Sequence, residues 1–141
     1  MGRTDEAKNS ATQALAVIKA SMRFEPNQPD ITKARALALA LLGQGDSAEK
    51  VARRVREIYP RSLDDWGGAD YLLEATGILA IAGRDELVFE WLDDYLSGGG
   101  ALFTLIAIRE LPVFSRLVDE PEFSALIKQH GLVPEDKSPP N

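Results

Sequence analysis

Apolar residues recur every three or four positions along much of the chain, which is the spacing of one face of an α-helix. In the first such segment they are Ala7, Ala11, Leu15, Ile18 and Met22. This pattern predicts a helix over residues 5–24, which Pro26 ends because proline cannot continue a helix. A second helix is expected from Asp30, as its N-cap, to Leu42, and Gly43 suits the turn that follows.

A third stripe at the same spacing comprises Ala48, Val51, Ala52, Val55, Ile58 and Tyr59. We expect Asp46 or Ser47 to cap this helix and Pro60 to end it. The polar residues 61–68, which include two glycines, are expected to form a connection. Residues 69–82 predict a helix that is apolar almost all round, as in a helix packed between neighbours on two sides.

Shorter helices are expected beyond this point. Asp85 is placed to cap a helix that ends at the glycines of residues 98–100, and another helix is expected over residues 101–108. No segment alternates apolar and polar residues as a half-buried strand does, and no Asn-Gly or Asp-Gly hairpin turn occurs. The pattern therefore predicts an all-α fold.

The C-terminal part is expected to hold two further short helices within residues 112–130. For the last of them, Asp119 is placed as the cap, Pro121 in the first turn and Gly131 as the stop. Residues 134–141 are polar and rich in proline, and we expect them to be disordered.

The predicted helices also repeat at fixed offsets. An offset of thirty-four residues aligns Ala14 with Ala48, Ile18 with Ala52, Ser21 with Val55, Phe24 with Ile58 and Pro26 with Pro60. An offset of forty aligns Ala36 with Thr76, Leu39 with Leu79, Gly43 with Gly83, Ala48 with Val88, Ala52 with Leu92 and Val55 with Tyr95. We expect the six extra residues of the longer unit in the connection around residues 64–68.

The repeated residues resemble those of the tetratricopeptide repeat family, whose period is about thirty-four residues of paired antiparallel helices. The positions that carry the resemblance are Ala36, Leu39, Gly43, Ala48, Ala52, Val55, Ile58 and Pro60. Thr32 and Arg35 depart from the family's usual aromatic residue and leucine, and the third unit is longer and lacks the closing proline. The resemblance implies an α-solenoid with a half-repeat over residues 5–26, a repeat over 29–60 and a degenerate repeat over 69–98.

The C-terminal stretch is similar to the ends of tetratricopeptide regions in some bacterial regulators and cyclases. The residues in this similarity are Phe114, Leu117, Asp119, Pro121, Phe123, Leu126 and Gly131. It implies that residues 101–132 form cap helices within a repeat domain over residues 1–133.

In the tetratricopeptide family, the first helices of the repeats line a concave groove that binds extended or helical segments of partner proteins. The resemblance places in that groove Lys33, Leu37, Ala40, Asp70, Leu73, Gly77 and Ala80. Leu37 stands where some members use an asparagine to clamp a terminal carboxylate, which argues against such a clamp. The alternative is that Leu37 and Leu73 are core residues and that the C-terminal helices close the groove.

Composition and charge restrict the function further. The net charge of -6 and the pI near 4.8, which no cluster of lysines and arginines offsets, argue against a nucleic-acid partner. The absence of cysteine and the single histidine exclude the common zinc and thiol-nucleophile sites. The sequence contains no signal-peptide or membrane-span pattern, so a cytoplasmic location is the default expectation.

Several side chains outside the groove are candidates for chemistry. We expect His130 to stabilise a helix C-terminus, and the glycines of residues 98–100 to form a hinge because they lack the other residues of a phosphate loop. Solvated charges at helix ends are expected for the acidic pairs Asp64/Asp65, Asp93/Asp94 and Asp119/Glu120. A candidate aromatic patch comprises Trp66, Trp91, Tyr95 and Phe103. Of these, Trp91 and Tyr95 fit a buried helix stripe better.

The sequence therefore predicts a protein–protein interaction module, without enzymatic activity or a cofactor, that binds a peptide or helix. The resemblance favours the scaffold or regulatory part of a larger bacterial protein. The alternative is a self-associating, homodimeric array with no separate ligand. An enzyme that uses the acidic pairs is a third hypothesis, which requires carboxylates that converge on one pocket.

Overall fold

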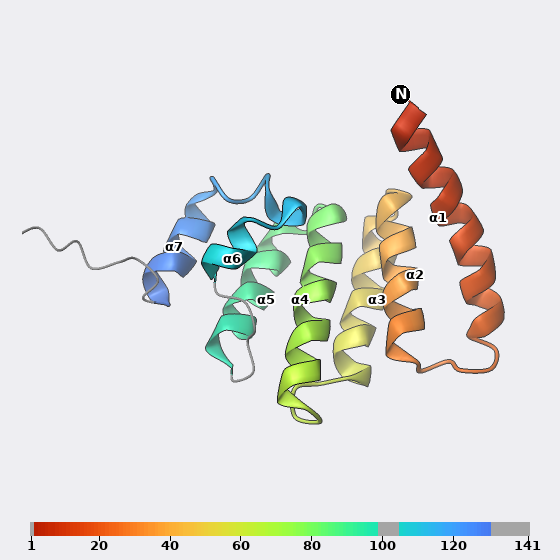
Figure 1. Cartoon of the computed structure of the whole chain (residues 1–141), viewed down its shortest axis with the longest axis horizontal. Helices are drawn as coiled ribbons and strands as arrows, with labels where there is room; N and C mark the ends of the chain where they lie inside the picture. Colours follow the sequence, from red (N-terminus) through yellow and green to blue (C-terminus); the bar gives the residue numbers. More distant parts are fainter. Residues whose placement is uncertain (1, 99–104, 131–141) are drawn as a thin grey trace, which may run out of the picture.

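The computed structural model describes residues 2–98 and 105–130, and this part of the chain is helical with no strand (Figure 1). Its elements are α1 (Gly2–Ser21), α2 (Pro29–Leu41), α3 (Gly45–Ile58), α4 (Asp65–Ile81), α5 (Asp85–Ser97), α6 (Leu105–Arg109), the 3-10 turn η1 (Pro112–Phe114) and α7 (Pro121–Gln129). The all-α prediction is confirmed. The expected tail over 134–141, the stop at Gly131, the aromatic candidate Phe103 and the start of the helix expected over 101–108 lie outside the described residues.

The first five helices lie side by side in a row, and each packs against the next one in the chain (Figure 1). In addition, α2 packs directly against α4, although α3 lies between them along the chain. Helix α1 forms one end of the row, and α7 packs on α5 at the other end. No helix in the described part is long and apolar enough to cross a membrane.

Two turns of the same geometry join α2 to α3 and α4 to α5. Gly43 and Gly83 have φ angles of 74° and 72°, in the left-handed region that favours glycine. One residue later, the amide of Gln44 donates to the carbonyl of Leu39 at 2.9 Å, and the amide of Arg84 donates to that of Leu79 at 3.0 Å. Gly43 and Gly83, which align at the offset of forty, therefore have the same structural role. Each ends one helix and allows the chain to turn into the next.

The other pairs aligned at the offset of forty are buried in both units. They are Ala36 with Thr76, Leu39 with Leu79, Ala48 with Val88, Ala52 with Leu92, and Val55 with Tyr95. At the offset of thirty-four the match is weaker, because Ile18 is only partly buried and Phe24 is 85% exposed. Helix α1 lies at the end of the row and packs mainly on α2, so fewer of its side chains are covered.

All four predicted N-caps are wrong, because Asp30, Asp46 or Ser47, Asp85 and Asp119 do not cap their helices. Gln28, not Asp30, caps α2, since its Oε1 accepts from the amide of Ile31 at 2.7 Å. The N-cap residues of α3, α5 and α7 are Gln44, Arg84 and Glu120, and none of these forms a side-chain cap bond. In the two short turns, Gln44 and Arg84 each bond back to the preceding helix and are also the N-cap of the next one. The carboxylate expected as the cap therefore lies inside the new helix. The carboxylates expected as caps, Asp46 and Asp85, instead pair with Arg84 and Arg116.

The connection expected over residues 61–68 is also too long, because α4 begins at Asp65. Asp64 caps this helix by accepting from the amide of Trp66 at 3.1 Å. The two glycines that suggested a loop lie in the first turn, where the chain passes close to the preceding segment. A Cβ on Gly68 would lie only 2.6 Å from the Cα of Arg61, so glycine permits this approach.

The C-terminal segment folds back onto α4 and α5. Phe114 of η1 and Phe123 of α7 are buried in the shared core. Arg116 fixes the segment, because its Nη1 donates to Asp85 at 2.7 Å and its Nη2 donates to the carbonyl of Ala80 at 2.9 Å. This contact places η1 beside the C-terminal half of α4, where it borders the groove described next.

Candidate functional site: an apolar groove

Helices α2 and α4 and the segment around η1 surround a groove of about 510 Å³. The residues that line it are Lys33, Ala34, Leu37, Asp70, Leu73, Glu74, Gly77, Ile78, Ile81, Leu111, Val113 and Phe114. Leu73, Ile78 and Phe114 are buried, whereas Leu37 and Ile81 are 38% and 42% exposed. The groove thus presents accessible aliphatic side chains above a packed apolar floor, which is the typical composition of a docking site for apolar groups.

Gly77 gives this groove part of its depth. The residue aligned with it in α2 is Leu37, whose side chain stands partly in solvent. A Cβ on Gly77 would lie 3.4 Å and 3.6 Å from the two methyl carbons of Val113. The missing side chain therefore leaves room between α4 and η1 without an unusual backbone angle, since the positive φ values belong to other glycines among the described residues.

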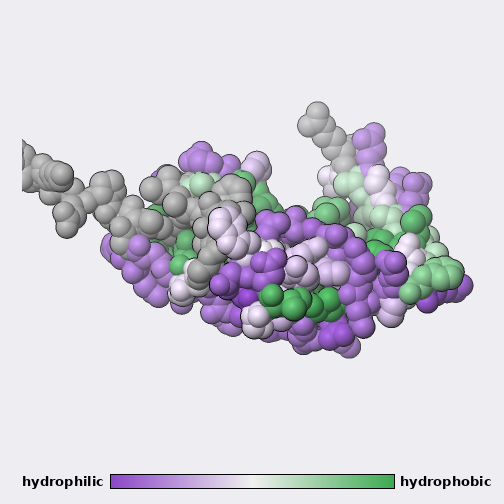
Figure 2. Space-filling model, turned by 60° about the horizontal axis from the view of Figure 1, so that its bottom comes forward, coloured by the Kyte–Doolittle hydropathy of each residue, from purple (hydrophilic) through white to green (hydrophobic). Residues whose placement is uncertain are grey.

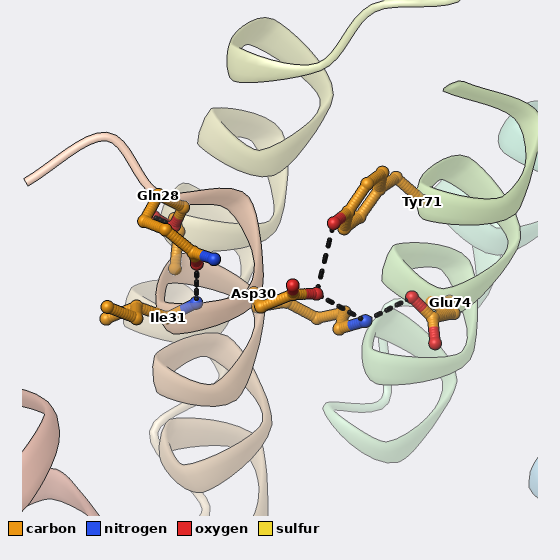
Figure 3. A network of polar contacts seen from close by, with 7 residues as sticks. Gln28, Asp30, Ile31, Tyr71 and Glu74 are labelled. Carbon is orange, nitrogen blue, oxygen red and sulfur yellow. Dashed lines mark hydrogen bonds and ion pairs between the residues drawn. The ribbon is translucent and has the colours of Figure 1, made fainter. Parts of the chain in front are cut away.

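The end of the groove near the start of α2 and the middle of α4 is polar (Figure 3). The ammonium of Lys33 lies between two carboxylates, with Asp30 at 3.3 Å and Glu74 in direct contact. Tyr71 donates its hydroxyl to Asp30 at 3.1 Å, and Lys33 lies 5.0 Å from the centre of the Tyr71 ring. These contacts join α2 to α4 and define one end of the groove.

The same contacts hold Asp30 and Lys33 in their charged forms and keep the Tyr71 phenol neutral. Hydrogen bonds from Lys33 and then from Tyr71 lower the pKa of Asp30 below its ordinary value. Burial acts to lower the pKa of Lys33, but the contacts with Glu74 and Asp30 outweigh it and the net shift is upward. Burial and the bond to Asp30 raise the pKa of the Tyr71 phenol. This end of the groove therefore carries fixed charges at neutral pH.

Five of the seven residues expected in the groove line it, namely Lys33, Leu37, Asp70, Leu73 and Gly77. The other two, Ala40 and Ala80, are buried in the core and do not line it, because both point into the packing between helices. Leu73 also belongs to the core, as the alternative reading expected. The C-terminal segment forms one wall of the groove and leaves Leu37 and Ile81 accessible.

Sequence reasoning placed the C-terminal helices at the groove only in the alternative that closes it, and it did not identify Leu111, Val113 and Phe114 as a wall of an open groove. No local signal could have revealed it, because it depends on how the segment after α6 folds back. Ile81 could have been predicted as a groove residue, because it follows Gly77 by four residues and so lies on the same face of α4.

The aromatic candidates do not form one patch. Trp91 and Tyr95 are buried in the core, as their helix stripe predicted, and the guanidinium of Arg56 lies 5.2 Å from the Trp91 ring centre. Trp66 is exposed near the start of α4. Trp91 and Tyr95 therefore serve as core residues, and Trp66 is separate from them.

The acidic pairs and the histidine are spread over the molecule. Asp64 caps α4, and Asp94 pairs with Arg56 on α3. His130 follows the last residue of α7, and its Nε2 lies 2.8 Å from Asp93 on α5, so it helps to hold α7 in place. Within the described ranges, no group of three or more acidic, histidine or cysteine side chains is placed to hold a metal ion.

A second hollow, of about 470 Å³, lies between α3 and α5 and is lined partly by arginines. Each of these arginines already has a protein partner. Arg53 bonds to Glu49 at 3.0 Å, Arg56 pairs with Asp94, and Arg61 donates to the carbonyl of Asp94 at 3.0 Å. Arg56 and Arg61 thus contact α5, whereas Arg53 bonds within α3, and this charged lining distinguishes the hollow from the apolar groove.

Exposed apolar side chains also occur at the lower end of the row of helices. Figure 2 turns this end forward and shows separate, small hydrophobic patches on a largely hydrophilic surface. Phe24 in the α1–α2 connection and Leu63 in the α3–α4 connection are exposed there, the latter at 66%. An isolated exposed leucine is ordinary on a protein surface, so Leu63 provides a control position for the groove.

No family model, curated protein or solved structure matches this chain. The groove and the contacts that shape it are therefore the basis of the functional argument.

Proposed function

We propose that this chain is a protein-interaction module of the tetratricopeptide type, which binds a segment of a partner protein in the groove between α2 and α4. The observation that carries the proposal is the groove itself, with Leu37 and Ile81 accessible above an apolar floor. A function in binding, without catalysis, fits the separation of the acidic pairs described above.

The packing of the helices supports a curved array. α2 packs directly against α4, whereas α3 and α5 do not pack closely and are linked by long side chains such as that of Arg56 to Asp94. Closer spacing on the side of α2 and α4 favours curvature toward that side. This arrangement is the one in which first helices line a concave face, and it agrees with the two matched turns at Gly43 and Gly83.

Burial of the accessible groove side chains contributes modestly to the free energy of binding. Covering the accessible part of Leu37 and of Ile81 is worth roughly 1.5 kcal/mol each, at about 25 cal/mol per Å² of apolar surface. The complementary surface of a partner contributes a similar amount, while association carries its own entropic cost. The expected complex is therefore of moderate affinity and depends strongly on these two side chains.

A matched pair of variants tests this proposal. Leu37→Glu places a charge in the groove, whereas Leu63→Glu places the same charge on an exposed leucine outside it. Wild-type protein and the Leu63→Glu variant are expected to capture the same protein saturably from a native lysate, and the Leu37→Glu variant is expected to lose it. Capture that is equal for all three proteins, or no saturable capture by any, contradicts the proposal.

A second candidate function is self-association, and the outer face of α1 favours it. Val17 is 67% exposed, whereas Val51, its counterpart at the offset of thirty-four, is buried in the core. The exposed Phe24 likewise corresponds to Ile58, which is partly buried. Light scattering over a concentration series tests this candidate. A protein that remains a monomer at high concentration rules it out.

A further inference from the structure

The groove is chemically graded along α4. Asp70 and Glu74 line one end of it, and Ile78 and Ile81 line the other. Because the helix rises 1.5 Å per residue, the distance from the level of Asp70 to that of Ile81 is about 16 Å. This length matches about three turns of a second helix laid along α4.

The polar end carries an excess of negative charge. Asp30 and Glu74 share the single ammonium of Lys33. Asp70 is exposed, lines the groove and has no ion pair within the described part of the chain. Asp30, Glu74 and Asp70 thus supply three carboxylates at this end against one ammonium, and Asp70 is the one without a cationic partner among the described residues. A ligand that brings a cation to this end gains a charge-assisted contact.

The apolar end favours a helix as the occupant. Beyond Lys33, Asp70 and Glu74, the lining side chains are hydrophobic or glycine, so few groups are available to bond to a ligand's backbone. An extended segment would place unpaired amides and carbonyls against them, which is costly. A helix satisfies its own backbone and presents only side chains.

We propose that the groove binds an amphipathic helix of a partner protein that carries a lysine or arginine at one end, which pairs with Asp70. The apolar face of this helix lies over Gly77 and against Leu37 and Ile81. The inference rests on the proposed function of the groove and adds to it the conformation, charge and orientation of the partner segment.

Two synthetic helical peptides provide the probe. Both have about twenty residues, above the length of about 12–15 residues below which isolated helices are marginal in water, and carry leucines on one face. One carries lysine at one end and the other carries glutamate at the same position. Binding of each labelled peptide to the full chain is measured by fluorescence anisotropy. We expect the lysine peptide to bind about five- to tenfold more tightly, as a single charge-assisted pair at a partly exposed site allows.

Variants of the protein assign this preference to one side chain. Asp70→Asn is expected to remove most of the difference between the peptides, and Asp70→Lys to reverse it. Glu90→Lys is the matched control, since it changes the net charge equally at an exposed position on α5 outside the groove. Circular dichroism verifies that each variant keeps its helical content. An effect of Glu90→Lys as large as that of Asp70→Lys overturns the inference, because overall charge would then explain the preference.

The remaining outcomes separate this inference from the proposed function. If both peptides bind equally and Leu37→Glu abolishes binding of both, the groove is a docking site and the inference about charge is wrong. If neither peptide binds, the proposed function of the groove fails. If a lysine peptide with a central proline, which breaks its helix, binds as tightly as the helical one, the partner segment is extended and the inference about conformation is wrong.

Discussion

Substitution of Gly77 by alanine tests how the groove is built. A glycine within a helix destabilises it by about 0.5–1 kcal/mol relative to alanine. The new Cβ would meet the methyl carbons of Val113 at 3.4 Å and 3.6 Å, which is ordinary to slightly tight packing. Gly77→Ala is therefore expected to raise the free energy of unfolding by about 0.5–1 kcal/mol, because the gain in helix propensity exceeds the cost of a slight shift of Val113.

The measurement is urea unfolding followed by circular dichroism, with the m-value as a check that the unfolded state is unchanged. A rise in melting temperature of roughly 2–5 °C should accompany the gain. Gly68→Ala is the matched control, and it is expected to destabilise by about 1–3 kcal/mol because its Cβ would lie 2.6 Å from the Cα of Arg61. Equal effects of the two substitutions, or a loss of stability in Gly77→Ala, would refute this reasoning.

Three further predictions concern the contacts that hold the helices together. Arg116→Met is expected to cost about 1 kcal/mol, because a bidentate pair with Asp85 is lost at a partly exposed site, and to speed hydrogen exchange in the C-terminal segment. The pKa values of Asp30 and Asp85 are lowered by folding, so their contribution to stability is present above about pH 4 and is lost as the pH falls through their folded pKa values. Urea midpoints between about pH 6 and pH 2.5 should therefore fall more steeply for the wild type than for Asp85→Asn, and parallel curves would contradict this. Gly43→Ala and Gly83→Ala should each cost about 1 kcal/mol by urea unfolding, since alanine is strained at their positive φ angles, and a stabilised variant would contradict the turn geometry.

The helices could be predicted from the sequence because their buried stripes are periodic and their turns contain a residue type with a specific backbone role. Gly43 and Gly83 are the clearest case, since a left-handed turn residue follows two helices at the same offset. The buried pairs at this offset follow for the same reason. Both signals are local, because they depend only on residues close together in the sequence.

What could not be predicted depends on contacts between distant segments. The first turn of α4 was expected to be a loop because Gly67 and Gly68 favour turns, but close approach to the residues after α3 requires glycine there. The groove was predicted only in part. Leu37 and Gly77 follow from helix periodicity, whereas the wall at Val113 exists because Arg116 anchors the C-terminal segment to α4 and α5.

Amide chemical-shift mapping of the full chain with the lysine-bearing helical peptide tests the docking role of the groove most directly. The expected perturbations are saturable and lie along the groove, at Leu37, Gly77 and Ile81. Isolated residues at the lower end of the molecule, such as Leu63, should not respond. Perturbations centred instead on the arginine-lined hollow between α3 and α5, or no saturable perturbation at all, would contradict a docking role for the groove.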